Sequence, residues 1–127
     1  MIKLLVVDDE KGITDPLKEF FERRGFAVTA VNNGEQALEA LKKDKPDIVF
    51  LDIVMKGMSG IEVLKHIKSV DKNIKVIMLT IHEEKDIIEQ TQQSGADEYI
   101  TKPFRIDYLE EVVIKKVPEL LKEKDNG

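Results

Sequence analysis

Acidic, hydroxyl and ammonium side chains follow four of the apolar runs in this sequence. If those runs are parallel strands, their carboxyl ends meet at one edge of the sheet, where open α/β sheets bind ligands. Each of these side chains alone is an ordinary loop residue, but together they indicate a site. The side chains are Asp8 and Asp9 after the first run, Asp52 after the third, Thr80 ending the fourth and Lys102 after the fifth.

Three carboxylates in one crevice, those of Asp8, Asp9 and Asp52, require cations beside them. Two like charges ~4 Å apart repel by about 1 kcal/mol in water and about 4 kcal/mol at an effective dielectric constant of 20. Lys102 supplies one positive charge, and Mg²⁺ suits carboxylate, carbonyl and water ligands. One carboxylate could then act as a nucleophile, while the metal, the ammonium and the Thr80 hydroxyl stabilise a transferred phosphoryl group.

Five apolar runs alternate with five helical patterns, which predicts an α/β fold with a doubly wound, five-stranded parallel sheet. The predicted strands are 2–7, 26–31, 48–51, 75–79 and 98–100. Asn33 with Gln36, and Ser59 with Glu62, predict the starts of the second and third helices. The fourth helix, 83–94, carries only a weak apolar stripe and is expected to be the least firmly held.

Two further predictions concern prolines and the last helix. Pro16 is expected in the first turn of the first helix, where no intrahelical N–H is required. In the last helix Tyr108, Leu109, Val112 and Val113 are expected to face inward, with a kink near Val117 because Pro118 follows.

Length and composition place the chain among compact, non-membrane proteins. The 127 residues predict a single domain, 1–127, with a polar tail from about 119. The net charge of −5 without a basic stripe disfavours direct nucleic-acid binding, and no run is long enough for a signal peptide or a membrane span. There is no cysteine for a thiol nucleophile or a disulfide. A cytoplasmic location is expected.

The acids, the threonine and the Lys102-Pro103 pair, at these spacings, resemble the receiver domains of two-component response regulators from Ile2 to about Lys116. The resemblance implies a flavodoxin-like (βα)5 fold with strand order 2-1-3-4-5. It also implies a phosphoacceptor signalling domain that catalyses only its own phosphotransfer and dephosphorylation.

Position by position, the resemblance implies a phosphoacceptor at Asp52. The implied ligands of Mg²⁺, with Mn²⁺ as a substitute ion, are Asp9, Asp52 and the backbone carbonyl of Val54. Asp8 would hold a metal-bound water, and Lys102 would bridge Asp52 and then its phosphoryl group.

The resemblance also implies a switch and its partners. Thr80 would turn its hydroxyl to the phosphoryl group, Tyr99 would swing inward, and the Lys102-Pro103 peptide bond would be cis. The phosphodonor would be a sensor histidine kinase or a phosphotransfer protein. A downstream protein would dock on the face formed by the fourth helix, fifth strand and fifth helix, with the chain a monomer or a phosphorylation-dependent dimer.

Several alternatives stay open at this point. One is a Mg²⁺-dependent phosphohydrolase with an aspartyl nucleophile, although such enzymes carry an Asp-x-Asp motif after the first strand. Others are a flavin-binding module, a receiver used only for docking, a phosphorelay intermediate, and the receiver fragment of a longer DNA-binding regulator.

Two residues depart from the pattern of the family. Lys56 stands where the family commonly has proline, and Ile81 stands where it favours a small residue. Val54 and His82 lie where the family tunes the access of water. The hypothesis from the sequence is that Ile81 crowds the phosphoryl pocket and slows hydrolysis of the aspartyl phosphate.

Overall fold

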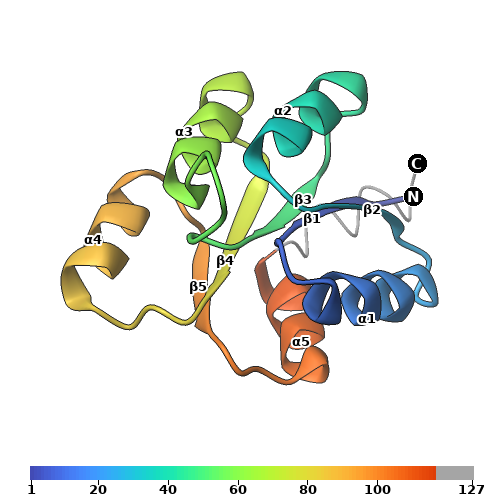
Figure 1. Cartoon of the computed structure of the whole chain (residues 1–127). Helices are drawn as coiled ribbons and strands as arrows, with labels where there is room; N and C mark the ends of the chain where they lie inside the picture. The colour runs from blue at the N-terminus through green and yellow to red at the C-terminus, as the bar shows by residue number, and fades with distance from the viewer. Residues whose placement is uncertain (117–127) are drawn as a thin grey trace.

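The computed structural model describes residues 1–116, in which five strands alternate with five helices (Figure 1). The strands are β1 (Lys3–Val7), β2 (Ala27–Val31), β3 (Ile48–Leu51), β4 (Lys75–Thr80) and β5 (Glu98–Thr101). The helices are α1 (Lys11–Glu22), α2 (Gly34–Lys43), α3 (Gly60–Val70), α4 (Lys85–Gln93) and α5 (Ile106–Lys116). In these residues no helix has both the length and the apolar character that crossing a bilayer requires.

All five strands are parallel and lie in the order β2-β1-β3-β4-β5, which confirms the predicted fold. The register brings the strand ends to one level. Val7 of β1 lies opposite Leu51 of β3, so Asp8 and Asp52 emerge side by side. Thr80 of β4 lies opposite Thr101 of β5, directly before Lys102.

Two apolar cores hold this sheet, one on each face. α1 and α5 cover one face, and α2 and α3 cover the other, with α4 beside β5 (Figure 1). In the first core the rings of Phe21 and Phe50 meet edge to face, with centroids 5.4 Å apart. β3 is buried along its whole length, as its unbroken apolar run indicates. The strand that leads into Asp52 is therefore buried at every position.

Two helices begin where the sequence predicts. The Asn33 side chain accepts a hydrogen bond from the Gln36 N–H at 2.8 Å, and the Ser59 hydroxyl accepts one from the Glu62 N–H at 3.3 Å. These side chains satisfy N–H groups that the first turn of a helix leaves without an internal partner.

Two predictions about the helices are wrong. α1 begins at Lys11, so Pro16 lies inside the helix and not in its first turn. Proline has no N–H to donate to the carbonyl of Gly12, four residues earlier, but both residues are exposed, so that carbonyl can bond to water instead. Tyr108 is 49% exposed, because Leu109, Val112 and Val113 alone form the buried stripe of α5. The expected kink near Val117 and the polar tail lie outside the described residues.

Candidate functional site

Two buried carboxylates and one ammonium form the centre of the site. Asp8 and Asp52 are only 2% and 6% exposed, and both lie at the carboxyl ends of neighbouring strands. The Lys102 Nζ donates to Asp8 Oδ2 at 2.7 Å and to Asp52 Oδ2 at 3.4 Å. The Lys102-Pro103 peptide bond that precedes α5 is cis. Lys102 thus bridges the two acids and lies closer to Asp8.

The charges of this group shift the protonation of its members. Burial raises the pKa of the Asp52 carboxyl, opposed by the charge of Lys102, while the negative charge of Asp8 adds to the rise. Burial alone would lower the pKa of the Lys102 ammonium, but its hydrogen bond to Asp8 and the charge of Asp52 raise it overall. Lys102 is therefore a firmly held cation beside a carboxylate of raised basicity.

The acids after β1 form a cluster that could hold a cation. Carboxylate oxygens of Asp8, Asp9 and Glu10 lie within 4.8 Å of one another, and the last two side chains are exposed. Asp8 belongs to this cluster and also shares Lys102 with Asp52. The cluster thus offers carboxylate oxygens beside the Lys102-linked pair of Asp8 and Asp52, and such oxygens are the donors that a hard divalent ion prefers.

Thr80 and Tyr99 are linked through the backbone of His82. The Thr80 hydroxyl, fully buried, accepts a hydrogen bond from the His82 N–H at 3.3 Å. The Tyr99 hydroxyl donates to the His82 carbonyl at 2.6 Å, so the tyrosine reaches the β4–α4 loop. Burial raises the pKa of the Tyr99 hydroxyl, which keeps it protonated and able to donate.

Lys56 and Ile81, which depart from the family pattern, lie at the surface, and so does Val54. Val54 and Ile81 are 54% and 70% exposed, and Lys56 is exposed as well. Because most of the Ile81 side chain faces solvent, the crowding of the phosphoryl pocket stays a hypothesis. The Val54 N–H lies 3.4 Å from Asp52 Oδ1 and turns the β3–α3 loop back toward the acid.

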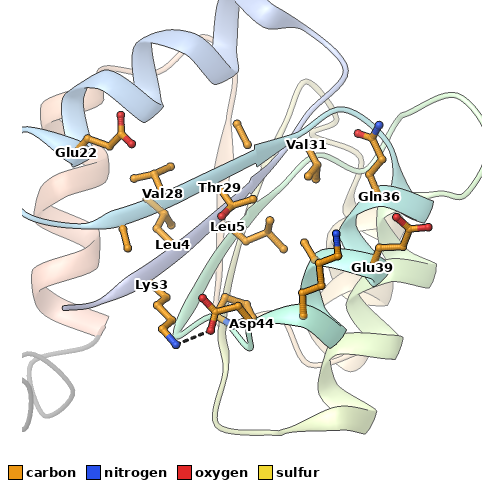
Figure 2. Close-up of a pocket in the computed structure, with 15 residues that line it drawn as sticks. Lys3, Leu4, Leu5, Glu22, Val28, Thr29, Val31, Gln36, Glu39 and Asp44 are labelled. Carbon is orange, nitrogen blue, oxygen red and sulfur yellow. Dashed lines mark hydrogen bonds and ion pairs between the residues drawn. The ribbon is translucent and has the colours of Figure 1, made fainter.

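An apolar groove of about 470 Å³ adjoins the site. Its lining includes the charged residues Lys102 and Glu10 and the exposed Ile81. The rest of its lining comes from α1, the β5–α5 loop and the first residue of α5: Gly12, Ile13, Pro16, Leu17, Pro103, Phe104 and Ile106. A larger hollow, of about 720 Å³, lies elsewhere, along β2 at the edge of the sheet and beside α2 (Figure 2). Lys3 and Asp44, which line this hollow, form an ion pair. Asp52, Asp8 and Lys102 are not among its lining residues.

Sequence reasoning missed two contacts that shape the surroundings of the site. Gly60 lies directly against the peptide of Asp52, a proximity that spacing alone does not reveal. The Lys68 ammonium donates to the Ile74 carbonyl at 2.6 Å and to Asp97 at 2.9 Å, which ties α3 to the turn between α4 and β5. A lysine in the last turn of a helix is the signal that could have indicated a cap, but not its distant partner.

Known proteins share this sequence and this fold. The family described as "Response regulator receiver domain" matches residues 4–114. Sporulation initiation phosphotransferase F of Bacillus subtilis (strain 168) is 42% identical over 116 residues, which cover 91% of this chain and 94% of that protein. Chemotaxis protein CheY of the same organism is 36% identical over 89% of this chain and 95% of its own length.

Solved structures agree with these matches. A CheY-like response regulator receiver domain protein from Methanospirillum hungatei JF-1 superposes with a TM-score of 0.91 at 28% identity, covering 97% of this chain and 98% of the other. A two-component response regulator from Clostridium difficile gives a TM-score of 0.90 at 27% identity, over 94% of this chain and 98% of its own. The predicted cytoplasmic location stays a prediction. Fold, site and relatives agree: the chain belongs to the response regulator receiver domain family, the phosphoacceptor signalling domains of two-component systems.

Proposed function

We propose that this chain takes a phosphoryl group onto Asp52 from a sensor histidine kinase or a phosphotransfer protein. The observation that carries the proposal is the pairing of the buried Asp52 carboxylate, after β3, with the firmly held Lys102 ammonium, after β5, at the same edge of the sheet. An Asp52 oxygen attacks the phosphorus of a phosphohistidine, the P–N bond breaks, and the imidazole leaves with the electron pair. The product is an acyl phosphate on Asp52.

Each neighbour of Asp52 has a part in that step. Lys102 already lies 3.4 Å from Asp52, so its ammonium can follow charge from the carboxylate to the incoming phosphoryl oxygens. Thr80 would exchange its bond from the His82 N–H for one to the phosphoryl group. Lys102 lies beside Asp52 before the reaction, which limits the reorganisation that the transfer requires of it.

A divalent metal, Mg²⁺ or Mn²⁺, fits the residues present. Asp9, Asp52 and the Val54 carbonyl would be direct ligands, and Asp8 would hold a bound water. The fit rests on the carboxylate oxygens of these acids, with which Lys102 is the one ammonium that pairs among residues 1–116. When bound, the metal supplies charge compensation for the carboxylates and for the phosphoryl oxygens.

The response to phosphorylation would pass through the β4–α4 loop. His82 connects Thr80 to Tyr99, so a shift of Thr80 toward Asp52 changes the contacts of the tyrosine as well. α4 follows this loop, and its first residues, Lys85 and Asp86, are exposed. The surface of α4, β5 and α5 is therefore the face proposed for a downstream protein.

The phosphodonor would reach Asp52 across the apolar groove. Ile81, Pro103 and the start of α1 give a protein donor apolar surface beside a charged acceptor. A small donor such as acetyl phosphate needs only the acidic end. A change in the groove should therefore affect phosphorylation by a protein donor and not phosphorylation by acetyl phosphate.

A second candidate role is that of a phosphorelay intermediate. The relative called a phosphotransferase is 42% identical to this chain and matches over 94% of its own length. An intermediate passes its phosphoryl group on to a histidine. Incubation of the phosphorylated chain with a histidine phosphotransfer protein would test that role by transfer of the label.

The primary test is incubation with Mg²⁺ and acetyl phosphate, followed by intact-mass measurement. We expect one added phosphoryl group in the parent chain, and none in Asp52→Asn or with EDTA. Turnover of an added phosphomonoester without a labelled protein would instead support the phosphohydrolase alternative. An unlabelled parent chain at millimolar Mg²⁺ would contradict the proposal.

A further inference from the structure

The first residue of α3 lies directly against the peptide group of Asp52. The Gly60 N–H donates to the Ile53 carbonyl at 2.8 Å, which closes the β3–α3 loop over the end of β3. A Cβ atom added at Gly60 would lie 1.9 Å from the Asp52 carbonyl oxygen and 2.7 Å from the Ile53 Cα. Gly60 is helical, so space rather than backbone conformation requires a glycine here.

The atoms that such a Cβ would meet cannot easily give way. They belong to the backbone, not to the free end of a flexible side chain. The Asp52 N–H is itself held by the Val7 carbonyl at 3.0 Å, within the buried part of the sheet. Any added volume must therefore move either α3 or the peptide that joins Asp52 to Ile53.

Displacement of that peptide would change the site directly. The Asp52 side chain branches from the residue before this peptide, and the chain after it leads to Val54. The Val54 N–H lies 3.4 Å from Asp52 Oδ1. We infer that Gly60 is a positioning residue: it lets the start of α3 rest on the Asp52 peptide and so fixes where the phosphoacceptor carboxylate points. This inference rests on the proposed function, because it assigns Gly60 a part in phosphorylation of Asp52.

The chain provides a closely matched control at Gly34. Gly34 is likewise the first residue of its helix, after the capping Asn33, and its added Cβ would also meet the β3–α3 loop. There the contacts are the Met58 Cβ at 2.8 Å and the Val63 Cγ2 at 3.1 Å, which are side-chain atoms. Alanine is a better helix former than glycine, so a loss at either position reports crowding and not helix propensity.

The test compares Gly60→Ala and Gly34→Ala with the parent chain, each at a temperature well below its own melting temperature. Because small misplacements of a reacting group are costly, we expect Gly60→Ala to slow phosphorylation by acetyl phosphate at least about tenfold, and Gly34→Ala to stay within about twofold. Occupancy by beryllofluoride with Mg²⁺, followed by ¹⁹F NMR, should fall in the same order, and it does not depend on turnover.

The outcomes separate a failure of the role of Gly60 from a failure of the proposed function. Equal rates and equal beryllofluoride occupancy in the three proteins would overturn the role of Gly60 and leave the proposed function standing. A parent chain that neither reacts nor binds beryllofluoride would contradict the proposed function itself. Equal losses in both variants would show that crowding of the loop, not contact with Asp52, is responsible.

The parent protein provides a second measurement if Gly60→Ala does not fold. Beryllofluoride with Mg²⁺ should shift the Gly60 amide in a ¹⁵N–¹H spectrum and leave the Gly34 amide close to its original position. A Gly60 amide that does not move while beryllofluoride occupies the site would refute the inference.

Discussion

Replacement of Lys102 by methionine tests the electrostatic centre of the site. The ammonium lies 2.7 Å from Asp8 and 3.4 Å from Asp52, which corresponds to attractions of about 6 and 5 kcal/mol at an effective dielectric constant of 20. The cost of burying the ammonium offsets much of that sum. Loss of one partner from a buried ionic group typically costs about 3–5 kcal/mol, and we expect Lys102→Met to lie in this range at pH 7.

The assay is urea unfolding at pH 7 and pH 5 without divalent metal. With a slope of about 2 kcal/mol per molar urea, the midpoint of Lys102→Met should fall by roughly 2 M at pH 7. Lys102 opposes the rise in the pKa of Asp52, so in the variant this pKa rises further. The folded variant then takes up a proton more readily than the unfolded chain, and its deficit should shrink as the pH falls to 5.

Lys45→Met is the control for loss of an ion pair without burial. Lys45 pairs with Asp71 at 2.7 Å, but its side chain is 56% exposed, so we expect a loss below about 1 kcal/mol. The reasoning is refuted if Lys102→Met costs no more than this control, or if its deficit is the same at both pH values.

Three further substitutions separate the contributions around the site. Asp52→Asn should raise the melting temperature in metal-free buffer by a few degrees, about 1 kcal/mol, because it removes a buried charge; its response to Mg²⁺ in scanning calorimetry should be smaller than that of the parent. An unchanged metal response would argue against Asp52 as a ligand. Lys68→Met should lower the free energy of unfolding by about 2 kcal/mol, because Asp97 and the Ile74 carbonyl lose a part-buried donor; a urea midpoint equal to that of the parent would count against this clamp. Ile81→Ala should slow labelling by a phosphorylated kinase roughly fivefold, ~1 kcal/mol for a truncated apolar contact, and leave labelling by acetyl phosphate unchanged. The rate at which the aspartyl phosphate of Ile81→Ala hydrolyses is a second readout. The exposed position of Ile81 predicts no change in this rate, whereas the crowding hypothesis predicts faster hydrolysis.

The sequence predicts the sheet well because its signals are local. The apolar run before Asp52 defines a strand buried on both faces, and Asn33 and Ser59 mark helix starts through hydrogen bonds to residues three positions away. Such signals survive folding because their partners lie close in the chain. Tyr108 is a residue for which a local signal was misleading. It lies next to the apolar stripe of α5 in the sequence, yet nearly half of its surface is exposed.

The sequence predicts which residues follow the strands and form the site, but it does not predict the distances between them. That Lys102 lies closer to Asp8 than to Asp52 depends on the register and on the β5–α5 loop. The contact of Gly60 with Asp52 depends on how α3 seats on the sheet, and a glycine at a helix start has the same local signature at Gly34. Packing between elements, not local pattern, determines these features.

Reduction of the phosphorylated chain with borohydride tests the central claim most directly, because it converts an aspartyl phosphate into homoserine and so marks its position for peptide mass analysis. After treatment with Mg²⁺ and acetyl phosphate, we predict homoserine at position 52 alone. Homoserine at Asp8 or Asp9, or none at all in a chain that carries a phosphoryl group, would contradict the account.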